Sequence, residues 1–476
     1  MNDESYNEAH RGNCLLPTFC RFLARIALLA MACLAVVAPR ANASGHSCRV
    51  VEKKFDGWQA VEMSNKWITL TIVPQLGGRL MQIEFAGHAF LFVNPQFKGK
   101  YFPPTLGAGQ GKWFNYGGDK IWPMPEGNQD DHHWPGPIAD ALDDGEYFAS
   151  ILSQGHACGV RLDGPPDEKT GLQYSRVITI DGGSPEISFH AVMKNILAHP
   201  IQWSVQSVTQ YDLSDSQTPS SYNHNFWAYT PANPNSVYLD GYHVRSGLAD
   251  DPSFSIQNDL FTLHWLYLQN EVWVDSPGDW LVAVDRSSHF AMVERFRVHP
   301  GANYPGKATV IFYKNGPAVE MDAQGMPAIR ANVDDTPFYM EAEINSPIVH
   351  LNPGETYSMD TEWLPTRAAD SFQGVTPAGI IGVPLSVTSD GSKLRVTGSF
   401  GVFFPGRLEA RILDSTGRRL ANVSLGVARP EDLLTLNREF AAPADAARVQ
   451  IALIDESERD RGILGEAAVV RNAGGH

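Results

Sequence analysis

Residues 186–194 read Glu-Ile-Ser-Phe-His-Ala-Val-Met-Lys, with an apolar side chain at every second position from Ile187 to Met193. Successive side chains of a β-strand point to opposite faces of the sheet, so this alternation gives the segment one apolar and one polar face. The stretch therefore predicts a β-strand with one face buried against a core.

Similar stretches recur along most of the chain. Residues 67–73, 338–344 and 357–363 are strand-like, and no long amphipathic helix stands out after residue 43. Many antiparallel strands over roughly 320 residues do not stay in one twisted sheet, because such a sheet curls or splits. We therefore expect an all-β fold whose larger part has two stacked sheets.

The composition excludes several classes of protein. The chain has 476 residues with 42 glycines and 32 prolines, which suits short strands joined by turns. With 43% hydrophobic and 19% charged residues, it is neither a disordered chain nor a coiled coil. The net charge is -16 and no block of Lys or Arg stands out, so nucleic acid is not an expected partner.

A change in composition divides the chain. All 11 tryptophans lie between Trp58 and Trp363, and residues 366–385 after them are rich in Ala, Gly, Ser and Pro. We expect a large domain over residues 44–365, a linker over 366–385 and a C-terminal domain over 386–476.

The C-terminal domain repeats the strand pattern on a smaller scale. Alternating runs cover residues 394–400 and 408–412, and a further apolar run covers 449–454. This pattern predicts a small immunoglobulin-like β-sandwich. Its four phenylalanines are more typical of a core than of a sugar-stacking platform, so we expect a packing role, with ligand binding as the alternative.

Residues 1–43 have the pattern of an export signal. Two arginines precede an apolar run at residues 26–38, which is too short to span a bilayer comfortably, and residues 41–43 read Ala-Asn-Ala. A buried N-terminal helix and lipid attachment at Cys33 are the alternatives. We expect a periplasmic or secreted protein with no membrane span after cleavage of the signal.

Only two of the five cysteines, Cys48 and Cys158, follow the signal. In an oxidising compartment two such cysteines can pair, and the bond would close a loop of about 110 residues. Two unrelated thiols are the alternative. Neither cysteine has neighbours that indicate a nucleophile or a metal site.

The segment from Trp113 to Gly127 is the densest in side chains that bind sugars. It contains Trp-Phe-Asn-Tyr-Gly-Gly-Asp-Lys-Ile-Trp-Pro-Met-Pro-Glu-Gly, in which Asp119 and Lys120 stand among aromatic residues. Aromatic faces cover the C–H patches of a sugar, and fixed polar groups bind its hydroxyls. A rigid packed loop with an internal Asp–Lys pair is the alternative. The glycine pair does not open a helix, so it is not a phosphate-binding loop.

His132 and His133 follow two aspartates and suggest a metal site. Adjacent residues of a strand point to opposite faces, and further ligands would have to come from elsewhere in the chain. We therefore expect no metal ion.

Glu341 and Glu343 share one face of the strand expected at residues 338–344. Two carboxylates on one face repel each other, and burial raises the pKa of a carboxyl, which is one way to make a general base. A solvated outer face is the alternative for two glutamates at this spacing.

Four motifs, taken in order, resemble the galactose mutarotase-like superfamily over about residues 50–365. They are Ile-Val-Pro-Gln-Leu-Gly-Gly-Arg at 72–79, Gly-Gly-Asp-Lys-Ile-Trp-Pro-Met-Pro at 117–125, the strand pair at 186–203 and the closing segment at 340–355. More closely, the chain resembles a bacterial branch with the signature Asn-Tyr-Gly-Gly-Asp-Lys-x-Trp-Pro.

The resemblance implies a β-supersandwich with a sugar-binding groove. In aldose 1-epimerases a glutamate removes the anomeric hydroxyl proton while a histidine protonates the ring oxygen. Glu341 matches the glutamate, but residues 203–211, where the histidine is expected, contain none. Lys120, His132 or His224 could replace it, and a glutamine could not, because it has no useful acidic proton.

We therefore expect an exported carbohydrate-binding protein whose partner is a mono- or oligosaccharide and which needs no cofactor. One alternative is an aldose 1-epimerase, an isomerase, with Glu341 as the general base; another is a relative of polysaccharide lyases or glycoside hydrolases. The expected catalytic residues are Glu341 and Lys120. The expected substrate-binding residues are Arg79, Trp113, Tyr116, Asp119, Trp122, Gln206 and Gln210.

Overall fold

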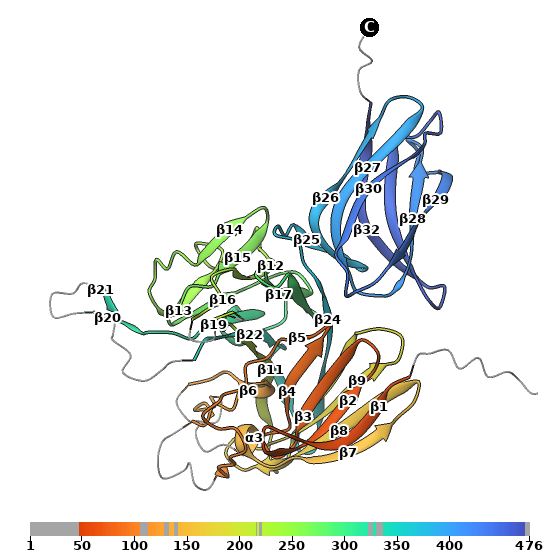
Figure 1. The fold of residues 1–476 in the computed structure, drawn as a ribbon. Helices are drawn as coiled ribbons and strands as arrows, with labels where there is room; N and C mark the ends of the chain where they lie inside the picture. The colour runs from red at the N-terminus through yellow and green to blue at the C-terminus, as the bar shows by residue number, and fades with distance from the viewer. Residues whose placement is uncertain are drawn as a thin grey trace, which may run out of the picture. The chain divides into compact units, whose positions relative to one another are not determined.

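Nearly all the regular structure of the protein is β-strand, so the expected all-β fold is confirmed (Figure 1). The helices whose bounds lie within the described residues are one short α-helix, α3 (Ala141–Asp144), and one 3-10 turn, η1 (Pro305–Lys307). The computed structural model describes residues 47–104, 113–127, 133–137, 141–215, 217–218, 221–321, 327–329 and 337–471.

Twelve of the described strands form the first sheet, which carries the candidate site. Its order is β1 (Arg49–Phe55), β2 (Trp58–Ser64), β3 (Ile68–Val73), β4 (Arg79–Phe85), β6 (Asp119–Met124), β11 (Ile201–Asp212), β22 (Tyr339–Asn345), β19 (Val310–Lys314), β16 (Asn270–Val274) and β13 (His243–Gly247). Two short strands join it, because β5 (His88–Ala89) pairs with β4 and β23 (Val349–Leu351) pairs with β11.

Ten strands form the second sheet. Its order is β14 (Phe254–Gln257), β15 (Leu260–His264), β12 (Phe226–Pro231), β17 (Trp280–Asp285), β18 (Phe290–Arg295), β24 (Thr356–Arg367), β10 (Ile187–Asn195), β9 (Leu172–Asp181), β8 (Ala157–Asp167) and β7 (Phe148–Ser153). A separate small hairpin joins β20 (Val319–Met321) to β21 (Pro327–Ile329).

The main hydrophobic core contains side chains from both large sheets. On β10 the predicted alternation is confirmed, because Ile187, Phe189, Ala191 and Met193 are all buried. The ring of Phe189 lies 4.6 Å from that of Trp363 on the neighbouring strand β24. Burial of this one face sets the register of the strand, since a slip by one residue would turn these side chains to solvent.

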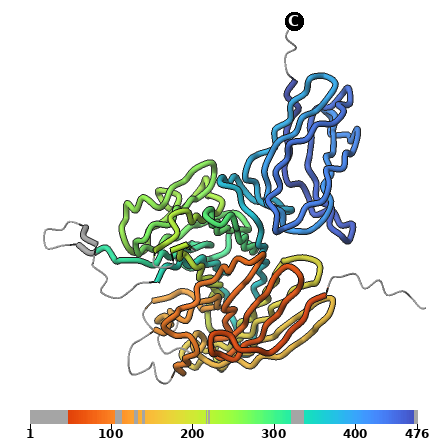
Figure 2. Tube along the Cα trace, in the orientation of Figure 1, coloured from red at the N-terminus to blue at the C-terminus, as the bar shows by residue number. Residues whose placement is uncertain are grey.

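The strands from residue 374 onward form a sheet of eight strands, drawn in blue in Figure 1 and gathered together along the trace in Figure 2. They are β25 (Gly374–Val375), β26 (Gly379–Ser389), β27 (Lys393–Val402), β28 (Gly406–Leu413), β29 (Arg419–Ala428), β30 (Leu434–Ala441), β31 (Arg448–Asp455) and β32 (Asp460–Arg471). β26 begins inside the stretch expected to be a linker, and the domain boundaries stay predictions.

Two further features bear on the predictions made from the sequence. Cys48 and Cys158 are joined by a disulfide, with their Cα atoms 5.9 Å apart. Among the described residues, no helix has the length and apolar character needed to cross a membrane. The expected export signal at residues 1–43 lies outside the described residues, so export stays a prediction.

Candidate functional site

A cleft of about 490 Å³ lies over the half of the first sheet that runs from β6 to the edge strand β13. Strands β6, β11, β22, β19, β16 and β13 supply most of its walls, although their segments are up to about 220 residues apart in the chain. The lining residues are Trp113, Trp122, Met124, Glu126, Gly127, Pro137, Gln206, Arg245, Ser246, Gln269, Glu271, Trp273, Ile311, Tyr313, Glu341 and Glu343.

The register of the strands explains why polar groups gather in this cleft. Paired residues of neighbouring strands lie side by side and point to the same face. One row across the sheet runs Gln210, Glu341, Tyr313 and Glu271. The adjacent row runs Lys120, Val208, Glu343, Ile311 and Trp273. Two rows of one pleated face therefore carry three carboxyl groups and one amine.

Glu341 and Lys120, the two predicted catalytic residues, form a buried ion pair. Lys120 Nζ donates to Glu341 Oε1 at 3.0 Å, and Gln210 Nε2 donates to the same oxygen at 2.6 Å. Burial lowers the pKa of Lys120, and the neighbouring carboxylate of Glu341 acts in the opposite direction. Two donors on one oxygen hold the Glu341 carboxyl group in one orientation.

Two indole rings stand beside this pair. Lys120 Nζ lies 4.4 Å from the ring centroid of Trp122 and 5.7 Å from that of Trp113. Both indole N–H groups donate to one carboxylate, that of Asp143 on α3, at 2.8 and 3.0 Å. Asp143 therefore holds the two rings in place, while both Trp113 and Trp122 line the cleft.

Arg79 supports this wall from behind. It is fully buried and is absent from the cleft lining. Its guanidinium contacts Asp143 Oδ1 at 2.6 Å and donates to the carbonyl oxygen of Gly117 at 3.1 Å. The structure thus places Arg79 next to the carboxylate that positions the tryptophans, and its predicted contact with substrate stays a prediction.

Asp119 and Tyr116 also lie away from the cleft lining. Asp119 neighbours Lys120 on β6, so its side chain points to the opposite face, where it pairs with Arg176 of β9. Tyr116 is fully buried, and its hydroxyl accepts a hydrogen bond from the backbone N–H of Phe102 at 2.9 Å. Of the predicted binding residues, Trp113, Trp122 and Gln206 line the cleft. Gln210 is not a lining residue, but it donates a hydrogen bond to the lining residue Glu341.

Three further carboxyl groups line the cleft that were not among the predicted site residues. They are Glu126, Glu271 and Glu343. Burial raises the pKa of Glu126 to about 7, with Glu271 and Glu341 adding to the shift. Burial also raises the pKa of Glu271, while its hydrogen bond from Trp273 and the charge of Arg245 lower it. The pKa of Glu343 lies well above its usual range because of burial and then because of the charges of Glu341 and Glu271.

The far wall of the cleft is formed by Trp273 on β16 and Arg245 on β13. The indole N–H of Trp273 donates to Glu271 Oε1 at 2.5 Å, and the exposed guanidinium of Arg245 lies 5.9 Å from the Trp273 ring centroid. The alternation of Glu271 and Trp273 with buried valines was a readable strand pattern. The pairing of this strand with residues 310–314, which in turn pair with residues 339–345, could not be predicted, because it depends on long-range register.

No histidine is among the described residues that line the cleft. His132 lies outside the described residues. His224 instead packs its ring 4.0 Å from that of Tyr222, and its carbonyl oxygen lies 2.8 Å from His264 Nε2. Within the described part of the chain, no three His, Cys, Asp or Glu residues are grouped closely enough to hold a metal ion.

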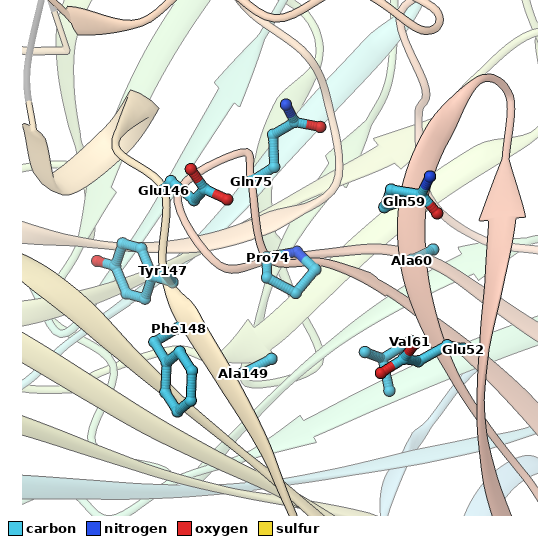
Figure 3. A pocket seen from close by; sticks show the side chains of 10 residues that line it. All are labelled: Glu52, Gln59, Ala60, Val61, Pro74, Gln75, Glu146, Tyr147, Phe148 and Ala149. Carbon is cyan, nitrogen blue, oxygen red and sulfur yellow. The ribbon is translucent and has the colours of Figure 1, made fainter.

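A second hollow of about 580 Å³ shares no lining residue with the cleft (Figure 3). It has two carboxylates and no basic side chain, and none of the predicted site residues lines it. Its lining residues are Glu52, Gln59, Ala60, Val61, Pro74, Gln75, Glu146, Tyr147, Phe148 and Ala149. The cleft over β6, β11 and β22 is therefore the candidate site.

No protein-family model and no curated protein matches this chain. Solved structures similar to it include a TPR-domain containing protein from Parabacteroides distasonis, with 13% identity and a TM-score of 0.41; the match covers 68% of this chain and 56% of that one. Another is a galactose mutarotase-like protein from Clostridium acetobutylicum, with 9% identity, a TM-score of 0.42 and coverage of 67% and 99%. A third is a galactose mutarotase related enzyme from Lactobacillus acidophilus, with 10% identity, a TM-score of 0.39 and coverage of 65% and 98%.

Proposed function

We propose that the cleft binds a mono- or oligosaccharide. The observation that carries this proposal is the set of indole rings, Trp113 and Trp122 on one side and Trp273 on the other, with carboxyl and amide groups between them. A sugar offers apolar C–H patches on its ring faces and hydroxyl groups around its edge. Concave sites of this kind, with aromatic walls and a few fixed polar groups, are typical of small-molecule binding.

The two aromatic walls of the cleft lie on strands that are well separated in the sheet. Three strands, β11, β22 and β19, separate β6 from β16, so the backbones that carry Trp122 and Trp273 are about 19 Å apart. Side chains from both walls occupy part of that distance. The sequence motifs that resemble the galactose mutarotase-like superfamily support the same ligand class.

Binding is tested by titrating intrinsic tryptophan fluorescence with a panel of mono- and oligosaccharides, together with thermal shift measurements. We expect saturable binding, and we expect Trp273→Ala to raise the Kd at least about tenfold, which corresponds to about 1.4 kcal/mol. Trp227→Ala is the matched control, because Trp227 is half-buried and lies outside the cleft lining. If no sugar binds, uronic and phosphorylated sugars included, the proposal is wrong.

Chemistry at the anomeric carbon is a second candidate function of the same cleft. The observation that favours it is the Glu341 carboxylate, which Lys120 and Gln210 hold in one orientation on a strand. A carboxylate fixed in this way is suited to accept a proton from a bound hydroxyl group. Polarimetry on freshly dissolved aldoses tests this function by measuring the rate of anomer exchange. If Glu341 is the base, the Glu341→Gln variant should not accelerate the exchange. If the variant accelerates it as the wild type does, Glu341 is not the base.

We also propose that the protein is exported. The signal-like pattern of residues 1–43 supports this, as does the Cys48–Cys158 disulfide, since such bonds persist in oxidising compartments. Mass spectrometry of the protein isolated from its native cell should find a new N-terminus near residue 44. An intact N-terminus at Met1 in the mature protein would overturn the proposal.

A further inference from the structure

Glu341 and Glu343 occupy alternate positions on β22 and both line the cleft. Their Cα atoms are about 7 Å apart along the strand, and their side chains leave the same face of the sheet. The two carboxyl groups differ in their partners. The oxygen Oε1 of Glu341 accepts hydrogen bonds from a lysine amine and a glutamine amide.

Glu343 is placed so as to keep its proton. Its side chain is almost fully buried, and its hydrogen bond in the described structure comes from Gln206, a neutral amide. The charged groups that face it are mostly negative: Glu341 on its own strand, Glu271 on β16 and Glu126 after β6. Lys120 on β6 is the positive group among them, and its amine donates to Glu341.

The other two carboxyl groups of the cleft have a positive neighbour of their own. Arg245 favours the charged forms of both Glu126 and Glu271. Glu271 also accepts the hydrogen bond from the indole N–H of Trp273. Glu343 therefore differs from both, and two neighbouring carboxyl groups in unlike environments form an acid–base pair.

We propose that Glu343 is the general acid of the cleft, donating a proton to the ring oxygen of a bound aldose while Glu341 accepts the anomeric hydroxyl proton. This inference rests on the proposed binding of sugar. The anomeric hydroxyl group and the ring oxygen are bonded to the same carbon atom, so two carboxyl groups on one strand face can reach both. A carboxyl pair thus replaces the histidine that residues 203–211 lack.

The proton and electron balance of the step is complete without any co-reactant. Glu341 takes the hydroxyl proton, the freed electron pair makes the C1=O bond, and the bond from C1 to the ring oxygen breaks. The ring oxygen keeps that bonding pair and takes the proton of Glu343. After rotation about the C1–C2 bond, the ring oxygen attacks the other face of C1, Glu343 regains its proton and Glu341 returns the other.

The test measures anomer exchange of aldoses by NMR in the wild type, Glu343→Gln and Glu343→Asp, alongside sugar binding by tryptophan fluorescence. We expect Glu343→Gln to lower kcat by about 10²-fold or more, with KM changed by less than about threefold. The wild-type rate should decline at high pH as Glu343 loses its proton, and this decline should be absent in Glu343→Gln. Glu343→Asp, which keeps an acidic group, should retain part of the rate and the decline.

Glu84→Gln is the matched control, because Glu84 is an exposed glutamate on β4 of the same sheet, and its rate should equal that of the wild type. Sugar binding without anomer exchange in the wild type overturns the inference and leaves the proposed binding function intact. So does exchange that persists unchanged in Glu343→Gln. Absence of sugar binding overturns both. Unfolding curves of each variant separate loss of the acid from loss of the fold.

Discussion

A buried lysine forms an ion pair with the carboxylate on which the cleft depends. The side chains of Lys120 and Glu341 are 1% and 7% exposed, so neither charge is well solvated and each depends on the other. The flanking indole of Trp122 adds a favourable contact with the amine. Removing one partner of such a pair leaves an uncompensated buried charge, which costs more than the pair itself contributes.

Lys120→Met should therefore lower the free energy of unfolding by about 3–5 kcal/mol. The double variant Lys120→Met/Glu341→Gln should recover much of that loss, because no charge is then left unpaired. Urea unfolding measures both. Lys98→Met is the control: Lys98 pairs with Asp56 at 2.8 Å on the surface, where the expected loss is below about 1 kcal/mol. Equal losses in the single and double variants would contradict the argument.

One wall of the cleft could be predicted from the sequence, and the opposite wall could not. Trp113, Lys120 and Trp122 were found in the segment 113–127, Glu341 in the closing motif and Gln206 in the stretch where the histidine was expected. The structure brings all five together. The wall built by β16 and β13 was missed. The sequence of a five-residue strand does not specify which distant strand it pairs with. That pairing determines which side chains line the cleft.

At the scale of elements, two polar contacts cross the core between the large sheets. Asp119 on β6 pairs with Arg176 on β9, and the hydroxyl group of Tyr211 on β11 donates to Glu294 Oε1 on β18 at 2.6 Å. Alternation along single strands predicted which face of β10 is buried. It could not predict these polar contacts, because on each strand they occupy positions that the pattern assigns to apolar residues.

Glu294 makes the stability of the sandwich depend on pH. Burial raises its pKa from 4.5 to about 8. As pH rises above about 4.5 the unfolded chain loses this proton while the folded chain keeps it, so the stability contribution falls until about pH 8. The variant Glu294→Gln removes this dependence on pH, and the glutamine can still accept a hydrogen bond from Tyr211.

The free energy of unfolding of Glu294→Gln, relative to that of the wild type, should therefore rise by about 4 kcal/mol from pH 5 to pH 8 in urea unfolding. A constant difference would contradict the assignment.

At the scale of the whole molecule, the disulfide joins the ends of the two large sheets. Cys48 directly precedes β1, the edge strand of the first sheet, and Cys158 lies on β8, next to the edge strand β7 of the second. The segment between the two cysteines, which are 110 positions apart in the sequence, includes Lys120, Trp113 and Trp122. The bond therefore closes a loop that contains one wall of the cleft.

Breaking this bond should destabilise the protein through the unfolded state. In the chain-entropy model a closed loop of this length contributes about 4–5 kcal/mol, because the linked unfolded chain has fewer conformations to lose on folding. The double variant Cys48→Ser/Cys158→Ser should lose about that amount in guanidinium unfolding. Dithiothreitol should shift the wild-type midpoint toward that of the variant and leave the variant unchanged. If the wild type unfolds at the same denaturant concentration with and without the reductant, the bond does not stabilise the fold.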